Sequence, residues 1–481
     1  MPSIKKNLAF NLLLLTSNLL FPIISFAYAA RMVGPAGIGK VQFVITFASY
    51  FVLLAQVGIP VYGMREVAKI KNQPESLNKL FSELIVISIG SSFIMLLIYF
   101  TIILSVGWFQ NNIIFYLLGG LMVMTGFSVL DWFYMGLEKF RFLSLRSIII
   151  KIIALTALFV WVHSPADLLI YFIITLGSVL GNNLWNLFRL KGIVRLQFHL
   201  KGLSKHYRAL LILYISSLTI SIYTLGDTLL LGFLTDNKAV GFYTAAKKLI
   251  IITIPMITSL GTVLIPQLTK SIDTKNHRET HLRIRQSFAF ISLLGIPVSI
   301  GLIVFAPEIM RVFSGPDFTG AILTLQLTAP VIFLVGLGHL FGMQMLIPGG
   351  YEKQYLTATV WGMVISLTLN LLLIHTFRDK GAAITLLITE GLVSFVSYYY
   401  VVKKMQFKID WQPAGNAFLT SLIFIPPAII LRTMHLPLIS GLTAAISISA
   451  ILYLLLQYYL FKEPVLMEIV NYLYRKSRNK I

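Results

Sequence analysis

Long apolar runs separated by short polar segments form the pattern of residues along this chain. A bilayer's hydrocarbon core is about 30 Å thick and a helix rises about 1.5 Å per residue, so about 20 apolar residues can cross it. The pattern therefore predicts an all-α polytopic membrane protein with about fourteen transmembrane helices. The predicted spans are 8–30, 41–62, 81–106, 113–134, 142–162, 167–188, 208–234, 241–266, 286–306, 322–348, 355–376, 381–402, 415–432 and 438–461.

Basic residues are distributed unequally between the two sides that these spans define. When residues at span ends are counted with the adjoining loop, 29 of the 39 Lys and Arg residues fall on the side of the N-terminus, seven on the opposite side and three well inside spans. Cytoplasmic loops carry the excess of Lys and Arg, so both termini are predicted to be cytoplasmic. Topology thus accounts for most of the net charge of +21. Nucleic-acid binding is not expected, because the basic residues are spread over eight short segments rather than gathered on one face.

Composition agrees with membrane insertion and excludes some chemistry. The chain is 57% hydrophobic and 12% charged, with a mean hydropathy of +0.83. It contains no cysteine, which excludes disulfides and thiolate metal sites. The first apolar run imitates a signal peptide ending in "AYAA" at 27–30, but its length of about 20 residues favours a retained first span.

Two short stretches recur six spans apart with the same orientation. "GLEKF" at 136–140 matches "GYEKQ" at 350–354, and "GIGKVQF" at 37–43 matches "AVGFYTA" at 239–245. Six is an even number, so the repeat is parallel. It predicts two six-helix bundles related by a pseudo-two-fold axis along the membrane normal, with a cavity between them. Coincidental loop composition is the alternative.

Several stretches also resemble a known family. They are "YAARMVGPAGIGKVQF" (28–43), "GIPVYGMREVAK" (58–69), "MGLEKFRF" (135–142), "YTLGDTLLLGFLTDNKAVGFYTAAKKL" (223–249) and "YEKQYL" (351–356). The chain is similar to the bacterial Wzx flippases of O-antigen and capsule assembly, within the multidrug and oligosaccharidyl-lipid exporter superfamily. The resemblance implies an undecaprenyl-pyrophosphate-linked oligosaccharide as cargo. It also implies alternating access in the inner membrane, H⁺ or Na⁺ coupling, and a polymerase and a chain-length regulator as partners.

This resemblance and the repeat suggest a division of the chain. We expect residues 1–206 and 207–406 to form the two bundles. Residues 407–481 would add two spans and a basic cytoplasmic tail. Two extra C-terminal spans also occur in lipid II flippases of the superfamily, which keeps that substrate open as an alternative. A drug/cation antiporter is the other alternative within the superfamily.

Ionisable residues inside spans are candidates for function, because burying them in hydrocarbon is unfavourable. Asp227 and Lys247 each lie about ten residues from the apex of the hairpin joining their spans, so they are level and can form a structural ion pair. Asp227 cannot neutralise both Lys247 and Lys248. The surplus cation would then attract a pyrophosphate headgroup in a cavity, or extend its stem to the outer surface.

Other charges have two interpretations each. Lys151 and Arg31 either line the cargo cavity or end at the membrane interface. Glu390 either titrates in ion coupling or forms a neutral, hydrogen-bonded helix contact. Glu83 and Asp131, nearer the cytoplasmic ends, complete the set of acids available to a coupling site. The repeated stretches suggest matching cytoplasmic corners that gate the movement, formed by Glu138 with Lys139 and by Glu352 with Lys353.

Enzymatic signals are weak. "HRETH" at 277–281 lacks the Glu directly after the first His that a zinc protease requires, and "GPAGIGK" at 34–40 is followed by Val41 instead of Ser or Thr. A membrane-embedded polymerase would need a sizeable external loop, and the longest one predicted, around 307–321, is short. We therefore expect no enzyme activity, no metal and no cofactor.

Overall fold

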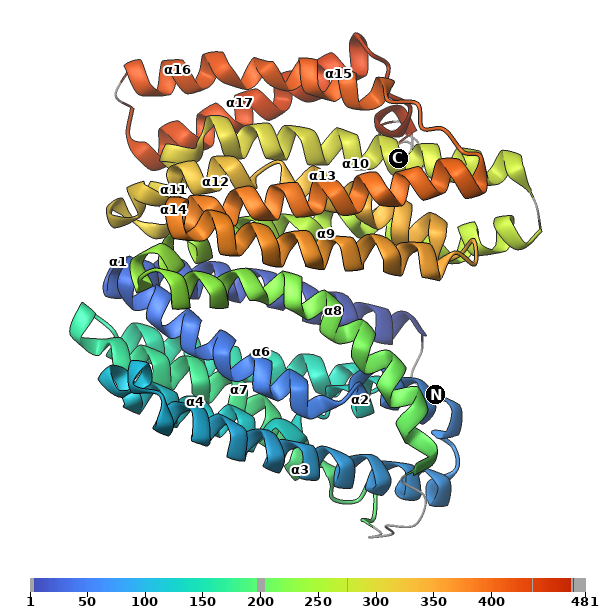
Figure 1. The fold of residues 1–481 in the computed structure, drawn as a ribbon. Helices are drawn as coiled ribbons and strands as arrows, with labels where there is room; N and C mark the ends of the chain where they lie inside the picture. The colour runs from blue at the N-terminus through green and yellow to red at the C-terminus, as the bar shows by residue number, and fades with distance from the viewer. Residues whose placement is uncertain (1–3, 197–203, 275, 435, 469, 471–481) are drawn as a thin grey trace, which may run out of the picture. The chain divides into compact units, whose positions relative to one another are not determined.

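The computed structural model describes residues 4–196, 204–274, 276–434, 436–468 and 470. Helices make up nearly all of these residues, joined by short turns, and the described part contains no strand. The fold divides into two compact units, residues 1–241 and 242–481 (Figure 1). The sequence predicts boundaries at 206 and 406 instead, and those six-helix boundaries remain a prediction.

The first unit contains, within its described residues, eight α-helices and the first turn of a ninth. Their bounds are α1 (Ile4–Gln56), α2 (Ile59–Ile70), α3 (Pro74–Ser105), α4 (Ile113–Met124), α5 (Asp131–Gly136), α6 (Phe140–Trp161), α7 (Leu168–Leu190), α8 (Ser204–Leu234) and α9 (Asn237–Asp273). Helix α8, which the sequence assigns to the second bundle, packs against α1 and α2 in this unit. Aromatic side chains such as Phe81, Trp132 and Phe133 fill the core between α2, α3 and α5.

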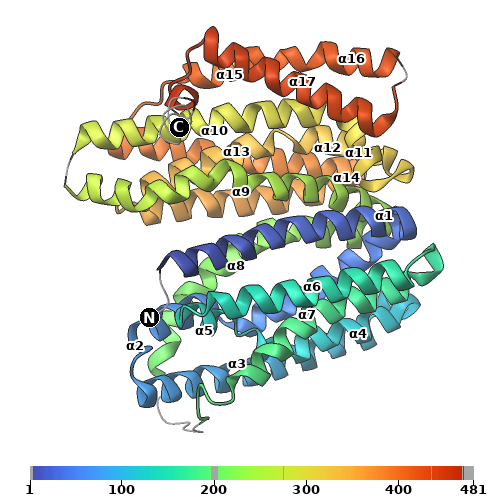
Figure 2. The same ribbon diagram turned by 180° about the vertical axis from the view of Figure 1, so that it is seen from behind.

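The second unit contains the rest of α9 and, in the part of the chain that the structure describes, eight further α-helices. They are α10 (His277–Val304), α11 (Ala306–Ser314), α12 (Ile322–Thr328), α13 (Val331–Gly338), α14 (Glu352–Tyr400), α15 (Gln412–Ser421), α16 (Ile425–Thr433) and α17 (Leu438–Tyr459). A π-helical segment, η5 (His339–Leu346), continues α13, and another, η6 (Val401–Met405), continues α14. Figure 2 shows α15, α16 and α17 on one side of α10, and α15 packs against α10.

Each predicted span coincides with a helical segment, although the helices are divided differently. By length and composition, ten described helices can cross a membrane, or eleven if the bent pair Gly107–Met124 and Gly126–Gly136 is one span. The difference from fourteen arises because α1 and α14 each carry all or most of two predicted spans, and because the apolar stretch found in α8, Leu225–Leu234, is too short to count as a span. The predicted all-α polytopic architecture is confirmed.

Sharp backbone breaks divide the two longest helices. Gly34 interrupts α1 with φ 67° and ψ 176°, and Arg378 interrupts α14 with φ 55° and ψ −128°. After the second break the chain folds back so closely that a Cβ atom on Gly381 would overlap the carbonyl of Leu373. Figure 1 accordingly shows α14 as two arms that meet at one end. The break at Arg378 lies between the predicted spans 355–376 and 381–402, so a turn of few residues joins them.

The prolines of the thirteenth predicted span lie at a helix start. A short 3₁₀ turn, η7 (Leu422–Phe424), separates α15 from α16, and Pro426 and Pro427 occupy the first turn of α16. Proline is tolerated there because the first backbone N–H groups of a helix have no intrahelical partner. Residues 412–433 therefore remain one candidate span.

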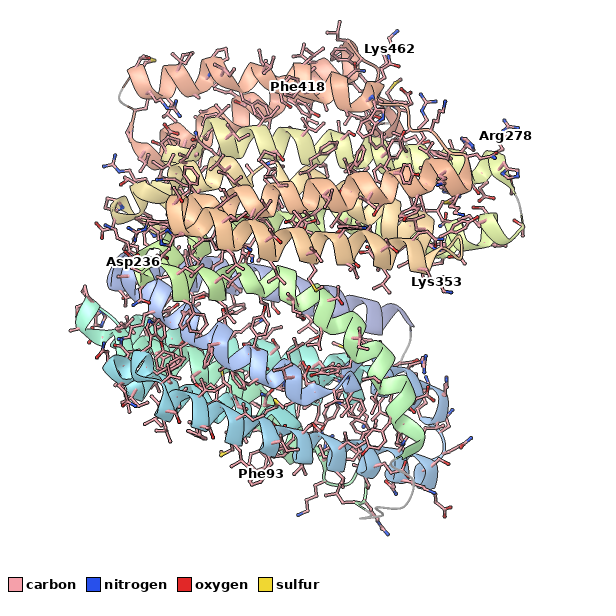
Figure 3. All side chains as sticks on the ribbon, in the orientation of Figure 1. Phe93, Asp236, Arg278, Lys353, Phe418 and Lys462 are labelled. Carbon is pink, nitrogen blue, oxygen red and sulfur yellow. The ribbon has the colours of Figure 1, made fainter. Side chains whose placement is uncertain are left out.

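Large apolar side chains point outward from both units. Phe93 on α3 and Phe418 on α15 are 60% and 53% exposed and extend away from the ribbon in Figure 3. All backbone hydrogen bonds of a helix interior are made within the helix, so such apolar faces suit contact with lipid tails. The arrangement is that of a multi-pass membrane protein.

The repeated glycine stretches meet inside the first unit. Gly39 and Gly241 occupy equivalent positions in "GIGKVQF" and "AVGFYTA". A Cβ atom on Gly39 would overlap the carbonyl of Asn237, and one on Gly241 would overlap the carbonyl of Pro35. Pro35 and Asn237 are themselves equivalent in the same alignment, so the contact is reciprocal. This geometry is what a two-fold related pair of segments produces.

Candidate functional site

Lys247 lies on α9 in the second unit, close to an acidic residue of α14. Asp236 Oδ1 accepts a hydrogen bond from the Ala239 N–H at 2.9 Å and so caps the start of α9, which places Lys247 in its third turn. Its ammonium lies 5.2 Å from the Tyr243 ring centroid, a cation–π contact. Glu390 lies within electrostatic range of Lys247. Both side chains are half-buried, as is that of Lys248.

The proximity of Lys247 and Glu390 was not predicted from the sequence. The sequence-based prediction pairs Lys247 with Asp227, and that pairing stays a prediction because the two residues belong to different units. A signal was present in the sequence. Lys247 and Glu390 each lie well inside an apolar span, and an apolar environment favours bringing opposite charges together.

A polar network in the same unit joins α10 to η5. Ser287 donates a hydrogen bond to Gln344 Oε1 at 2.7 Å, and Gln344 Nε2 lies 3.0 Å from His339 Nδ1. His339 and Gln344 both belong to η5, and π-helical segments occur frequently at functional sites. Helix α9 approaches closely at Gly261, where a Cβ atom would overlap the Gln344 amide. The interior of the second unit therefore contains hydrogen-bonded polar side chains, and Glu390 lies within electrostatic range of Tyr355.

Asp227 is buried in the first unit, with 2% of its surface exposed. Its Oδ1 accepts a hydrogen bond from the Thr228 N–H at 2.7 Å. The phenol of Tyr50 lies within electrostatic range and donates to the Ser221 carbonyl at 3.1 Å. Asp227 thus occupies a polar position within α8 that faces α1.

Lys151 and Arg31 occupy different environments in the first unit. Lys151 on α6 is half-buried, and its ammonium lies 6.0 Å from the ring centroid of Phe21. Arg31 is exposed and donates to the Ala27 carbonyl at 2.8 Å, three residues before the break at Gly34. Neither observation distinguishes a cargo contact from an interfacial position, so their roles stay predictions.

The two Gly-x-Glu-Lys stretches adopt different local structures. Glu138 has φ 57° and lies in the turn between α5 and α6, where it accepts from Lys71 Nζ at 2.6 Å. Glu352 is instead the first residue of α14, and the residue with positive φ is Gly350. Lys139 directly precedes α6, whereas Lys353 is the second residue of α14. Glu138, Lys139, Glu352 and Lys353 are all exposed.

An ion pair between the buried Arg146 of α6 and the partly exposed Asp131 of α5 was missed by sequence reasoning. Arg146 Nη1 and Nη2 donate to Asp131 Oδ1 and Oδ2 at 2.9 and 3.2 Å. Asn186 on α7 accepts from Arg146 and donates to Asp131 Oδ1 at 2.9 Å. Asp131 thus contacts α6 and α7 through a bidentate pair and an amide, and its role as a candidate for ion coupling stays a prediction.

Glu83 likewise joins a hydrogen-bonded network. His206 Nε2 lies 2.9 Å from Glu83 Oε2, and His206 Nδ1 lies 2.7 Å from the Tyr62 hydroxyl. All three side chains are buried, and they connect α2, α3 and α8. The described residues contain no group of three or more His, Asp or Glu that could hold a metal ion.

Comparison with known proteins assigns the family. Residues 4–272, more than half of the chain, match the family model described as "Polysaccharide biosynthesis protein". The chain belongs to this family. A relative from Escherichia coli K12 named "Putative O-antigen transporter" is 24% identical over 414 residues, which are 83% of this chain and 97% of the relative. "Probable low-salt glycan biosynthesis flippase Agl15" of Haloferax volcanii is 26% identical over 211 residues, or 44% of each chain.

Solved structures share the fold of this polysaccharide biosynthesis family member. "Lipid II flippase MurJ, inward closed conformation" superposes with a TM-score of 0.71 at 15% identity, covering 95% of this chain and 99% of that one. An inward-facing multidrug transporter of the MATE family superposes with a TM-score of 0.66 at 13% identity, covering 83% and 98%. These structures confirm the predicted fold.

Proposed function

We propose that this protein is a flippase for lipid-linked glycans, and specifically for undecaprenyl-pyrophosphate-linked oligosaccharide repeat units. The observation that carries the proposal is the position of Lys247 and Lys248, two adjacent half-buried cations in an apolar helix of a polysaccharide biosynthesis family member. A lysine ammonium binds phosphate as a point charge, and its attraction for an anion grows as the surroundings become less polar. The names of the O-antigen and glycan relatives support the same class of cargo.

The proposed mechanism is alternating access in the bacterial inner membrane, with both termini in the cytoplasm. The pyrophosphate and sugars would enter from the cytoplasmic leaflet while the polyprenyl chain stays in lipid. Movement of the two halves would then expose the headgroup to the periplasmic side. A polymerase and a chain-length regulator would act on the translocated product.

The pair formed by Lys247 and Glu390 suggests how an ion could be coupled to this movement. Protonation of Glu390, or binding of Na⁺ beside it, would leave Lys247 without its carboxylate neighbour. The lysine would then interact more strongly with the anionic headgroup. Cargo and coupling ion would in this way favour the same state of the second unit.

The test is transport in reconstituted liposomes. Undecaprenyl-pyrophosphate-linked oligosaccharide is placed in one leaflet, and an impermeant glycosidase reports its arrival in the other, with and without an H⁺ or Na⁺ gradient. We expect movement that depends on the protein and accelerates with one of the gradients. Absence of movement, together with efflux of a cationic dye, would replace this function by drug/cation antiport.

A further inference from the structure

A cavity of about 400 Å³ lies in the second unit, where the start of α10 meets the segment 406–411 that leads to α15. Three basic side chains line it, Arg278 and Arg285 from α10 and Lys408 from the segment. Figure 3 shows Arg278 at the N-terminal end of α10. None of these residues belongs to the candidate cargo site on α9 and α14.

Negative charge inside this cavity is smaller than its positive charge. Asp410 is the one acid among the described residues that line it, and its Oδ2 lies 3.9 Å from Arg285 Nη2. The Arg285 and Asp410 side chains are 64% and 50% exposed, so this long ion pair contributes little stability. Glu463 also lies within electrostatic range of Arg285. Burial raises the pKa of the Glu463 carboxyl, which lowers its negative charge at any given pH.

Apolar side chains form the other wall. Phe288 and Leu282 contribute from α10, and Phe407 contributes from the segment, with its ring centroid 4.3 Å from that of His281. Residues 277–304 form a candidate membrane span, so the cavity lies at the polar end of a helix that enters the bilayer. The distribution of Lys and Arg predicts that this end is cytoplasmic.

We propose that this cavity binds the phosphate headgroup of an anionic phospholipid from the cytoplasmic leaflet. Arginine and lysine together supply bidentate and point-charge contacts to phosphate oxygens. The apolar wall accommodates the start of the acyl chains, and the volume lies within the usual range for small-ligand sites. Basic pockets between helices on the cytoplasmic side suit such headgroups. The bound lipid would connect α10 to the segment that precedes α15 to α17.

The experiment is native mass spectrometry of the delipidated full-length protein titrated with phosphatidylglycerol or phosphatidylcholine. We expect preferential binding of phosphatidylglycerol, and an affinity reduced by about tenfold or more in the double variant Arg285→Gln/Lys408→Gln. The matched control is Arg65→Gln/Lys69→Gln, which removes two exposed basic residues of α2 and should change binding by less than about twofold. Equal binding by the wild type and the cavity variant would overturn the proposal.

A variant that is expected to bind more tightly tests whether a folding defect explains the weaker binding of Arg285→Gln/Lys408→Gln. Asp410→Asn removes the acid that lines the cavity and should tighten phosphatidylglycerol binding by about threefold. Weaker or unchanged binding would contradict the assigned role of the cations. Two further ligands identify the source of the phosphate. Tighter binding of undecaprenyl phosphate would reassign the cavity to cargo, and equal binding of glycerol 3-phosphate would reassign it to a soluble anion.

Discussion

Ionisable side chains within the helices of this protein meet polar partners inside their own unit. Arg146 pairs with Asp131, Glu83 with His206, and Lys247 lies near Glu390. An ionised group in an apolar environment is unfavourable unless a partner or a hydrogen bond compensates it. The first two groups satisfy this condition as structural contacts. Of the three, the pair on α9 and α14 is the one with a second, adjacent cation, Lys248.

We predict that Asp131→Ala destabilises the first unit. Arg146 is 4% exposed and would lose its carboxylate partner, while Asp131 is 44% exposed, which moderates the effect to about 1–3 kcal/mol. The measurement is thermal unfolding of the purified protein in detergent. Glu66→Ala, which removes a carboxylate paired with exposed Lys69 and Arg65 on α2, is the control and should cost under about 1 kcal/mol. Similar losses in both variants would contradict a larger stabilising role for the pair that contains the buried Arg146.

The sequence shows which charges lie inside apolar runs, but it does not show which residues they contact. Lys247, Asp227 and Glu390 could be selected because they interrupt apolar runs. The Arg146 network could not, because Arg146 lies near a span end where an interfacial position is the ordinary explanation. Partner choice depends on how each helix is rotated about its axis, and apolar runs that are hydrophobic on all sides do not specify this rotation.

Breaks and close approaches determine how the elements are arranged. Gly34 and Arg378 turn α1 and α14 back on themselves, and Gly39 and Gly241 allow two equivalent segments to touch through their backbones. The sequence predicted spans on both sides of each break correctly. The sequence could not show that a single residue with non-helical φ and ψ joins the two spans of each helix, because apolar run lengths do not distinguish such a break from an ordinary loop.

We predict that Gly39→Ala and Gly241→Ala each destabilise the protein by about 1–3 kcal/mol, because the added methyl group would overlap a backbone carbonyl that cannot move independently. Thermal unfolding measures the change. Gly90→Ala in α3 is the matched control. Among the described residues, no neighbouring atom lies within 4 Å of the position of this added methyl group. Alanine also stabilises a helix relative to glycine by up to about 1 kcal/mol. Stability unchanged by Gly39→Ala would refute the close contact.

The cytoplasmic corners give a prediction about rates. If both corners gate the movement, Glu138→Gln and Glu352→Gln each slow transport by about threefold or more while cargo binding stays constant. Glu66→Gln, an acid of α2 outside both corners, should leave the rate unchanged. Flipping rates in liposomes supply the measurement. Wild-type rates in both corner variants would mean that the repeated stretches have no gating role and only reflect a duplication. The different local structures of Glu138 and Glu352 would agree with that outcome.

At the scale of the whole molecule, apolar run lengths were sufficient to predict an all-helical polytopic protein. The quoted motifs were sufficient to predict a polysaccharide biosynthesis family, which the family match confirms, and its fold, which the solved structures confirm. The division into units differs at α8, since its packing against α1 and α2 depends on side-chain contacts rather than on span order. The proposed cargo is inferred from the charge of Lys247 and Lys248, so substitutions of these two residues test it.

The central claim is that the cations on α9 bind an anionic cargo, and the most direct measurement is the initial flipping rate of the double variant Lys247→Gln/Lys248→Gln. The account predicts a rate at least about tenfold below that of the wild type, as expected for the loss of charge-assisted contacts to phosphate. The matched control is Lys403→Gln/Lys404→Gln, an adjacent and exposed lysine pair that should keep its rate within about twofold. A folded Lys247→Gln/Lys248→Gln protein that transports at the wild-type rate would contradict the account.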